Sequence, residues 1–205
     1  MHTEMAAVLD APYERFIPLW GQTTEMRIIG AFDSVEANIN YVLGAMSLHA
    51  QADQIRKAVE IRMKYIGQAL RPRPGAIDTL TELKNHRYEI GLLSNCSIEI
   101  PILWHETAFA DLIDKPIFSS IEHLRKPDER IYHLACERLG IRPDSCLYIA
   151  DGEDHELAAA SNVGLHPVLI RTSAPEPGRR SHQEAREWKG TTISHLTEVL
   201  RLLAI

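Results

Sequence analysis

The stretch LYIADGEDHELAAASNVGLHPVLI, from Leu147 to Ile170, decides the fold. It opens with a short apolar run, continues through an acidic turn into a run of helix formers, and passes Gly164 before a second apolar run. Glycine at that place is typical of a helix C-terminus, because it adopts the left-handed backbone conformation without steric cost. The stretch therefore predicts a strand, a helix and a second strand, as in an α/β protein.

The residues on either side continue this alternation. Two more apolar runs lie upstream at 90–93 and 116–118, and helical stretches are expected around 77–85, 99–108 and 129–139. Strands that alternate with helices predict a three-layer, Rossmann-like α/β fold with a mostly parallel sheet covered on both faces. Residues 172–190, rich in Pro, Gly, Arg and Glu, predict a long exposed loop, and residues 196–203 predict a closing helix.

The sequence of the first third of the chain predicts helices and no strands. Asp33 and Ser34 with Glu36 predict a helix start, because a short acceptor and a following glutamate satisfy free backbone N–H groups. A second helix is predicted by apolar residues that recur on one face: Ile55, Val59, Met63, Ile66 and Leu70. The break Arg71-Pro-Arg-Pro-Gly75 then predicts a boundary between a small helical domain, residues 1–72, and an α/β core, residues 73–205.

Composition excludes several classes of protein. The net charge of −6 argues against a nucleic-acid partner, and no apolar run approaches the length of a membrane span. Three widely spaced cysteines predict free thiols in a reducing compartment, and the N-terminus carries no signal-peptide pattern. We therefore expect a cytoplasmic protein with no membrane partner. None of the ten histidines has zinc-site spacing.

Polar residues follow three of the apolar runs, and the carboxyl ends of parallel strands are where ligands bind in such sheets. Ser94 and Asn95 offer hydrogen-bond donors to an anion, although a helix cap would look the same. Lys126 precedes a proline that holds it in extended backbone, although a solvated surface lysine would fit too. Asp151 and Glu156 supply hard oxygen ligands that suit Mg²⁺, although helix N-termini also favour acids.

Taken together, these features resemble the haloacid dehalogenase-like (HAD-like) hydrolase superfamily. The matching stretches are LLSNCS, residues 92–97, FSSIEHLRKPDERIY, residues 118–132, and the stretch from Leu147 to Ile170. The resemblance implies that Ser94 and Asn95 bind the transferred group and that Lys126 steadies its charge. It implies Asp151 as the principal Mg²⁺ ligand and Glu156 as a second acidic residue, with a small phosphorylated metabolite as substrate. The helical segment then resembles the family's small cap.

One part of the family pattern is missing. The family's nucleophile is the first aspartate of a D-x-D pair at the end of the first strand, and no D-x-D occurs in the 205 residues. That strand would lie between the strands that end at Ser94 and Asp151. Its neighbours would pair directly, leave a groove, or pair with another chain, which would favour a homo-oligomer.

The missing motif leaves the function open. The full-length form is expected to be a Mg²⁺-dependent phosphatase acting through an aspartyl-phosphate, with this chain a truncated and impaired version. The alternative is a degenerate relative that acts as a binding or scaffold module. Trp20, Arg27 and Tyr65 could face the cleft, the core or the surface, and the sequence does not choose among these places.

Overall fold

The computed structural model of the chain describes residues 1–171 and 183–205, which form two compact units. The helical unit comprises Met1–Arg71, Asn95–Thr107 and Phe118–His123. The sheet unit comprises Pro72–Ser94, Ala108–Ile117 and the described residues of Leu124–Ile205. The predicted division into residues 1–72 and 73–205 stays a prediction, because the helical unit also includes two later segments.

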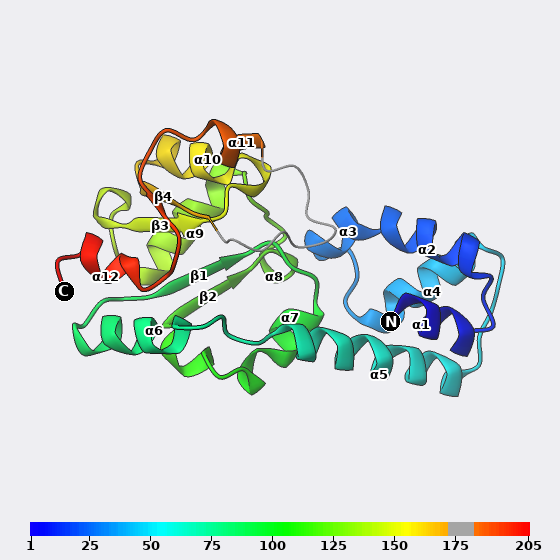
Figure 1. Cartoon of the computed structure of the whole chain (residues 1–205). Helices are drawn as coiled ribbons and strands as arrows, with labels where there is room; N and C mark the ends of the chain where they lie inside the picture. The colour runs from blue at the N-terminus through cyan, green and yellow to red at the C-terminus, as the bar shows by residue number, and fades with distance from the viewer. Residues whose placement is uncertain (172–182) are drawn as a thin grey trace. The chain divides into compact units, whose positions relative to one another are not determined.

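The helical unit is a bundle of helices around one apolar core (Figure 1). Met5, Phe16, Ile39 and Val42 are fully buried in that core, since the helices that carry them are amphipathic. Its helices are α1 (His2–Val8), α2 (Tyr13–Gln22), α3 (Thr24–Ile28), α4 (Val35–Ala45), α5 (Ala52–Ala69), α7 (Glu99–Leu103) and α8 (Ser119–Glu122), with a 3₁₀ turn at Trp104–Glu106.

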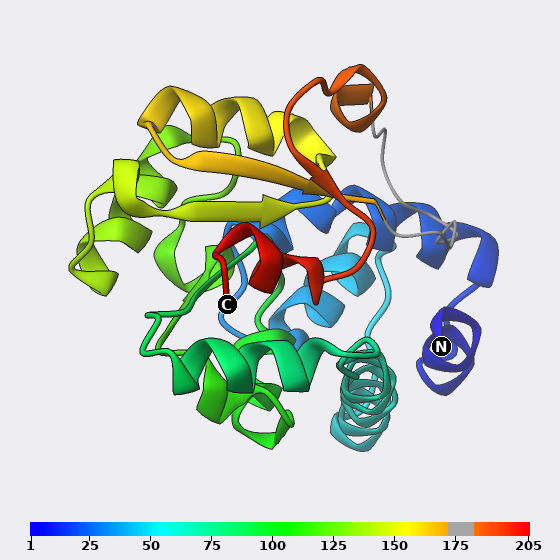
Figure 2. The same ribbon diagram turned by 60° about the vertical axis from the view of Figure 1, so that its left-hand side comes forward.

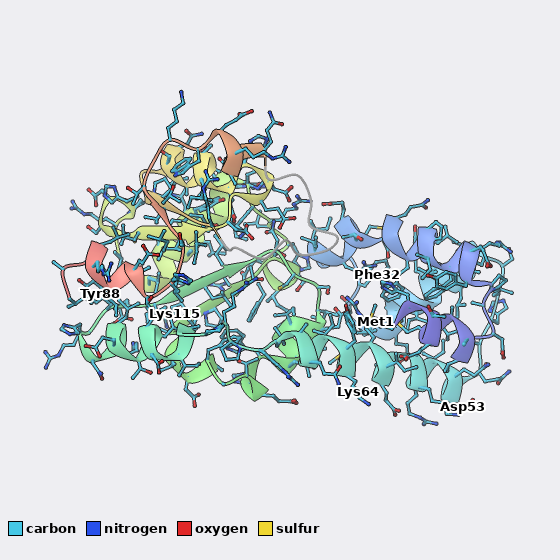
Figure 3. All side chains as sticks on the ribbon, viewed as in Figure 1. Met1, Phe32, Asp53, Lys64, Tyr88 and Lys115 are labelled. Atoms are coloured by element: carbon cyan, nitrogen blue, oxygen red, sulfur yellow. The ribbon has the colours of Figure 1, made fainter. Side chains whose placement is uncertain are left out.

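Two helices of this unit confirm the sequence pattern. The Ser34 hydroxyl accepts a hydrogen bond from the Ala37 backbone N–H at 3.0 Å, so α4 begins where the capping signal predicts. Helix α5 carries the predicted apolar periodicity, and Figure 3 shows Asp53 and Lys64 along its length. The same helix also buries Arg62, which an apolar pattern alone does not indicate.

The sheet unit alternates strands with helices, as the sequence predicts for an α/β fold. Its strands are β1 (Gly91–Ser94), β2 (Lys115–Phe118, the last residue of which belongs to the helical unit), β3 (Leu147–Ala150), β4 (His166–Ile170) and β5 (Thr192–Ile193). Its helices are α6 (Ala76–Asn85), α9 (Glu129–Leu139), α10 (Glu156–Val163), α11 (Gln183–Glu187) and α12 (Glu198–Leu202), with 3₁₀ turns at Ala110–Leu112, Pro143–Ser145 and Glu153–His155.

The strands form two sheets. Strands β3, β4 and β5 are parallel neighbours, with Ile149 opposite Val168 and Ile170 opposite Ile193 (Figure 2). Strands β1 and β2 form a separate pair. Within residues 1–171 and 183–205, β1 and β3 do not pair with each other, so each is the edge of its own sheet.

Helices of the sheet unit pack on these strands. Helix α9 contacts β1, and α10 contacts β3 and β4 around a core that includes Ile117, Ile131 and Tyr132. Gly140 and Gly164 end α9 and α10 in the left-handed conformation, with φ of 68° and 94°. The predicted helix ends at these two glycines are therefore confirmed.

The predicted loop over residues 172–190 is wrong in its second part, and residues 172–182 lie outside the described residues. Gln183–Glu187 forms helix α11, in which Glu184 and Ala185 are buried. The Glu184 carboxylate accepts hydrogen bonds from the backbone N–H groups of Leu157, at 3.0 Å, and Ala158, at 2.7 Å. A charged composition predicts exposure, but here a carboxylate satisfies the free N–H groups at the start of α10.

Candidate functional site

The strand ends of the sheet unit carry the predicted polar residues. Ser94 is the last residue of β1, and Asp151 directly follows the last residue of β3. Both are half-buried, so their side chains are neither solvated surface groups nor core. Ser94, Lys126 and Asp151 all belong to the sheet unit, whereas Asn95 belongs to the helical unit. That these side chains surround one phosphate-sized pocket stays a prediction.

Lys126 and Glu156 form a largely buried ion pair. The Lys126 Nζ lies 2.5 Å from Glu156 Oε2, and the two side chains are 16% and 3% exposed. A hydrogen bond between two charged groups in low-dielectric surroundings holds both in place. The ammonium of Lys126 is therefore fixed in the sheet unit and is not a freely moving surface charge.

The Glu156 carboxylate accepts hydrogen bonds from four donors. This arrangement differs from the metal-ligand role that the sequence suggests for Glu156. Its Oε1 accepts from the backbone N–H groups of Gly152, at 3.1 Å, and Glu153, at 3.3 Å. Its Oε2 accepts from Lys126 and also from the Tyr148 hydroxyl, at 2.9 Å. Both oxygens already accept two hydrogen bonds each, so the side chain fits the turn and the ion pair better than it fits a cation.

Two tyrosines complete the surroundings of Glu156. The Tyr132 hydroxyl donates to the Glu156 carbonyl oxygen at 3.0 Å, and the Tyr132 and Tyr148 rings meet edge to face with centroids 5.3 Å apart. Burial, with the Glu156 charge beside it, raises the pKa of each tyrosine well above its ordinary value. Both hydroxyls therefore stay protonated and donate at neutral pH.

A second ion pair runs beside the first. The Arg125 Nη2 lies 3.0 Å from Asp154 Oδ2, with side chains 25% and 30% exposed. The consecutive cations Arg125 and Lys126 thus bind Asp154, in the 3₁₀ turn after β3, and Glu156, the first residue of α10. The sequence does not predict this pair, because residues about thirty positions apart show no common pattern in the sequence.

The side chains that the structure describes do not form a complete metal site by themselves. Within the described residues, no three His, Cys, Asp or Glu side chains gather in a way that could hold a metal ion. Because Glu156 is saturated, Asp151 is the predicted ligand that still suits Mg²⁺, an ion that keeps several waters and takes few carboxylates. A Mg²⁺ site here would therefore depend on Asp151, water and the oxygens of a bound phosphate.

The parallel strands β3, β4 and β5, with helices packed on them, define an α/β protein. The family model of the haloacid dehalogenase-like hydrolases matches residues 2–164, and the chain belongs to that family. The fold class inferred from the sequence is confirmed by a solved HAD phosphatase from Thermococcus onnurineus. It is 19% identical with a TM-score of 0.64, over 98% of this chain and 86% of that one.

The curated relatives include phosphatases and a dehalogenase. The chain is 26% identical to a glyceraldehyde 3-phosphate phosphatase of Methanothermobacter thermautotrophicus over 65% of this chain and 59% of that protein. It is 28% identical to (S)-2-haloacid dehalogenase 4A of Burkholderia cepacia over 60% of this chain and 53% of that protein. The aligned part thus spans little more than half of these relatives.

None of the described helices combines the length and apolar composition of a membrane span.

Proposed function

We propose that the chain carries the phosphate-binding part of a Mg²⁺-dependent phosphatase that acts on a small phosphorylated metabolite. The observation that carries the proposal is the fixed ammonium of Lys126, held by Glu156 in the same unit as the strand-tip residues Ser94 and Asp151. A fixed cation with nearby hydrogen-bond donors suits the charge on a phosphoryl group. The phosphatase relative named above supports this reading.

Each residue has a role in this proposal. Ser94 donates a hydrogen bond to a phosphoryl oxygen, and Lys126 offsets the negative charge of the phosphoryl group. Asp151 would hold Mg²⁺, which when bound supplies further charge neutralisation at the phosphate. Glu156 positions Lys126 and the Gly152–Glu153 turn and does not itself bind the metal.

The proposal includes impaired catalysis by the 205 residues alone. Phosphoryl transfer through an aspartyl-phosphate needs an aspartate nucleophile, and the sequence offers no D-x-D pair to supply it. Without a nucleophile the remaining groups can only bind and polarise, which leaves a small part of the rate. The second candidate, a binding or scaffold module, is favoured by the same missing pair.

Two measurements test the proposal with the chain as it stands. Calorimetric titration with inorganic phosphate should give saturable binding that Mg²⁺ strengthens and that Lys126→Ala, Ser94→Ala and Asp151→Asn each weaken. The matched control is Asp53→Asn on α5, an exposed acid of the helical unit. Hydrolysis of an aryl phosphate should be very slow or undetectable.

The outcomes separate the candidates. Mg²⁺-dependent turnover abolished by Asp151→Asn would exclude the scaffold reading and the expectation of impaired catalysis. Phosphate binding without turnover would support the proposal as stated. Failure to bind phosphate under any Mg²⁺ concentration would contradict it and leave the scaffold reading.

A further inference from the structure

Tyr148 places a hydroxyl group in a strand that is otherwise apolar. The other residues of β3 are Leu147, Ile149 and Ala150. The Tyr148 ring packs against two apolar clusters of the sheet unit, and each of these clusters includes residues of α10. A phenylalanine would fill the same space without a hydroxyl, and a hydroxyl among apolar groups is costly unless it is hydrogen-bonded. The partner of this hydroxyl is therefore informative.

The Tyr148 hydroxyl binds the same carboxylate oxygen as Lys126. It donates to Glu156 Oε2 at 2.9 Å, and the Lys126 Nζ lies 2.5 Å from that oxygen. The three side chains come from β3, from the segment before α9 and from the first residue of α10, all within the sheet unit. A charged donor and a neutral donor therefore share one acceptor atom.

Sharing the acceptor moderates the ion pair. Each donor draws on the same negative charge, so the hydrogen bond from Tyr148 leaves less of that charge to attract the ammonium of Lys126. The second oxygen of Glu156 is bound by the backbone N–H groups of Gly152 and Glu153, which disperses the charge further. Lys126 is therefore held in place while its own positive charge is offset less completely than in a simple ion pair.

We propose that Tyr148 is a positioning residue that keeps the Lys126 ammonium available to an anion. Its hydroxyl acts through Glu156: it restrains the carboxylate and weakens the attraction between that carboxylate and Lys126. The Lys126 side chain is 16% exposed, so a ligand can reach it. The inference rests on the proposed function for the chemistry of the anion, a phosphate group. The effect of Tyr148 on the ion pair does not depend on which anion binds.

The test is Tyr148→Phe in the whole chain, which removes the hydroxyl and keeps the ring that meets Tyr132 edge to face. Hydrogen exchange of the Lys126 ammonium, followed by ¹⁵N NMR, should slow by about twofold or more, because Lys126 no longer shares its acceptor. A hydroxyl that only supports the fold predicts the opposite, since a loosened ion pair exchanges faster. Calorimetric titration with inorganic phosphate should show a Kd raised by about threefold to tenfold.

Two further variants serve as comparisons. Tyr65→Phe changes an exposed tyrosine of α5 in the same way and should leave both the exchange and the phosphate affinity unchanged. Tyr132→Phe removes a donor to the backbone carbonyl of Glu156, and the carboxylate keeps all four of its donors. It should therefore slow the exchange of the Lys126 ammonium less than Tyr148→Phe does.

The two readouts separate this inference from the proposed function. Faster or unchanged exchange in Tyr148→Phe would overturn the inference, and so would equal slowing in Tyr132→Phe. Slower exchange with an unchanged phosphate affinity would also overturn it, because the ammonium would then be equally available without the hydroxyl. If the unaltered chain binds no phosphate, the proposed function fails, and the exchange of the Lys126 ammonium alone decides whether Tyr148 moderates the ion pair.

Discussion

Glu156 is the residue on which the geometry after β3 depends, because it holds Lys126, Tyr148 and two backbone N–H groups at once. We expect Glu156→Gln to lower the free energy of unfolding by about 3 kcal/mol, because it removes a buried partner of a charged lysine. Urea unfolding measures this. Asp53→Asn, which removes an exposed pair, should change stability by less than about 0.5 kcal/mol, and equal effects would contradict the assignment.

Glu99 makes stability depend on pH in acid. Although burial opposes its ionisation, Arg62 beside it holds the pKa of Glu99 below its ordinary value of 4.5. Its contribution is therefore complete above pH 4.5 and is lost as the pH falls through the lower, native pKa. Urea unfolding should show the stability difference between the native chain and Glu99→Gln shrinking below pH 4.5. A difference that stays constant down to pH 3 would contradict this.

Single residues show what a sequence can and cannot say about a site. The places of Ser94 and Asp151 could be predicted, since each follows an apolar run that forms a strand. The ion pair between Lys126 and Glu156 could not be predicted, because it depends on a contact between residues thirty positions apart in the sequence. The sequence also left the place of Trp20 undecided, and in the structure it is a core residue with the guanidinium groups of Arg27 and Arg62 beside its ring.

At the scale of elements, helix α11 acts as a cap on helix α10. The Glu184 carboxylate accepts from two N–H groups that no residue within α10 can satisfy. We expect Glu184→Ala to speed hydrogen exchange at Leu157 and Ala158 by about tenfold, since a charge-assisted hydrogen bond is lost there. The control is Glu187→Ala, which removes only an exposed contact with Gln183. Unchanged exchange would contradict the capping role.

Most helices and strands can be predicted from the local sequence pattern, and helix α11 is an exception. Apolar runs of three to five residues between helical stretches predict β1 to β4, because backbone groups buried on both faces must pair. Helix α11 has no apolar face of its own. Glu184 and Ala185 are buried because Glu184 binds the start of α10 and Ala185 packs on Gly152, so its formation depends on a partner that the local sequence does not reveal.

For the whole molecule, the division of the strands into two sheets has a consequence for self-association. In the described part of the chain, strands β1 and β3 are sheet edges, and sheet edges offer backbone groups for pairing with other chains. We expect concentration-dependent self-association in analytical ultracentrifugation. Leu147→Lys, at a 37% exposed position of β3, should weaken it because charge discourages edge pairing. Tyr65→Lys on α5 is the control, and a monomer at every concentration would contradict the expectation.

The tyrosines around Glu156 give the sheet unit an optical signal of its own. Tyr132 and Tyr148 should not form phenolate in the native state until the solution is far more alkaline than pH 10, whereas unfolded tyrosines ionise near that value. Native stability therefore falls as alkali is added above pH 10, because the unfolded chain releases protons that the folded chain keeps. A delayed rise in ultraviolet absorbance near 295 nm would then mark the moment at which this half of the molecule opens.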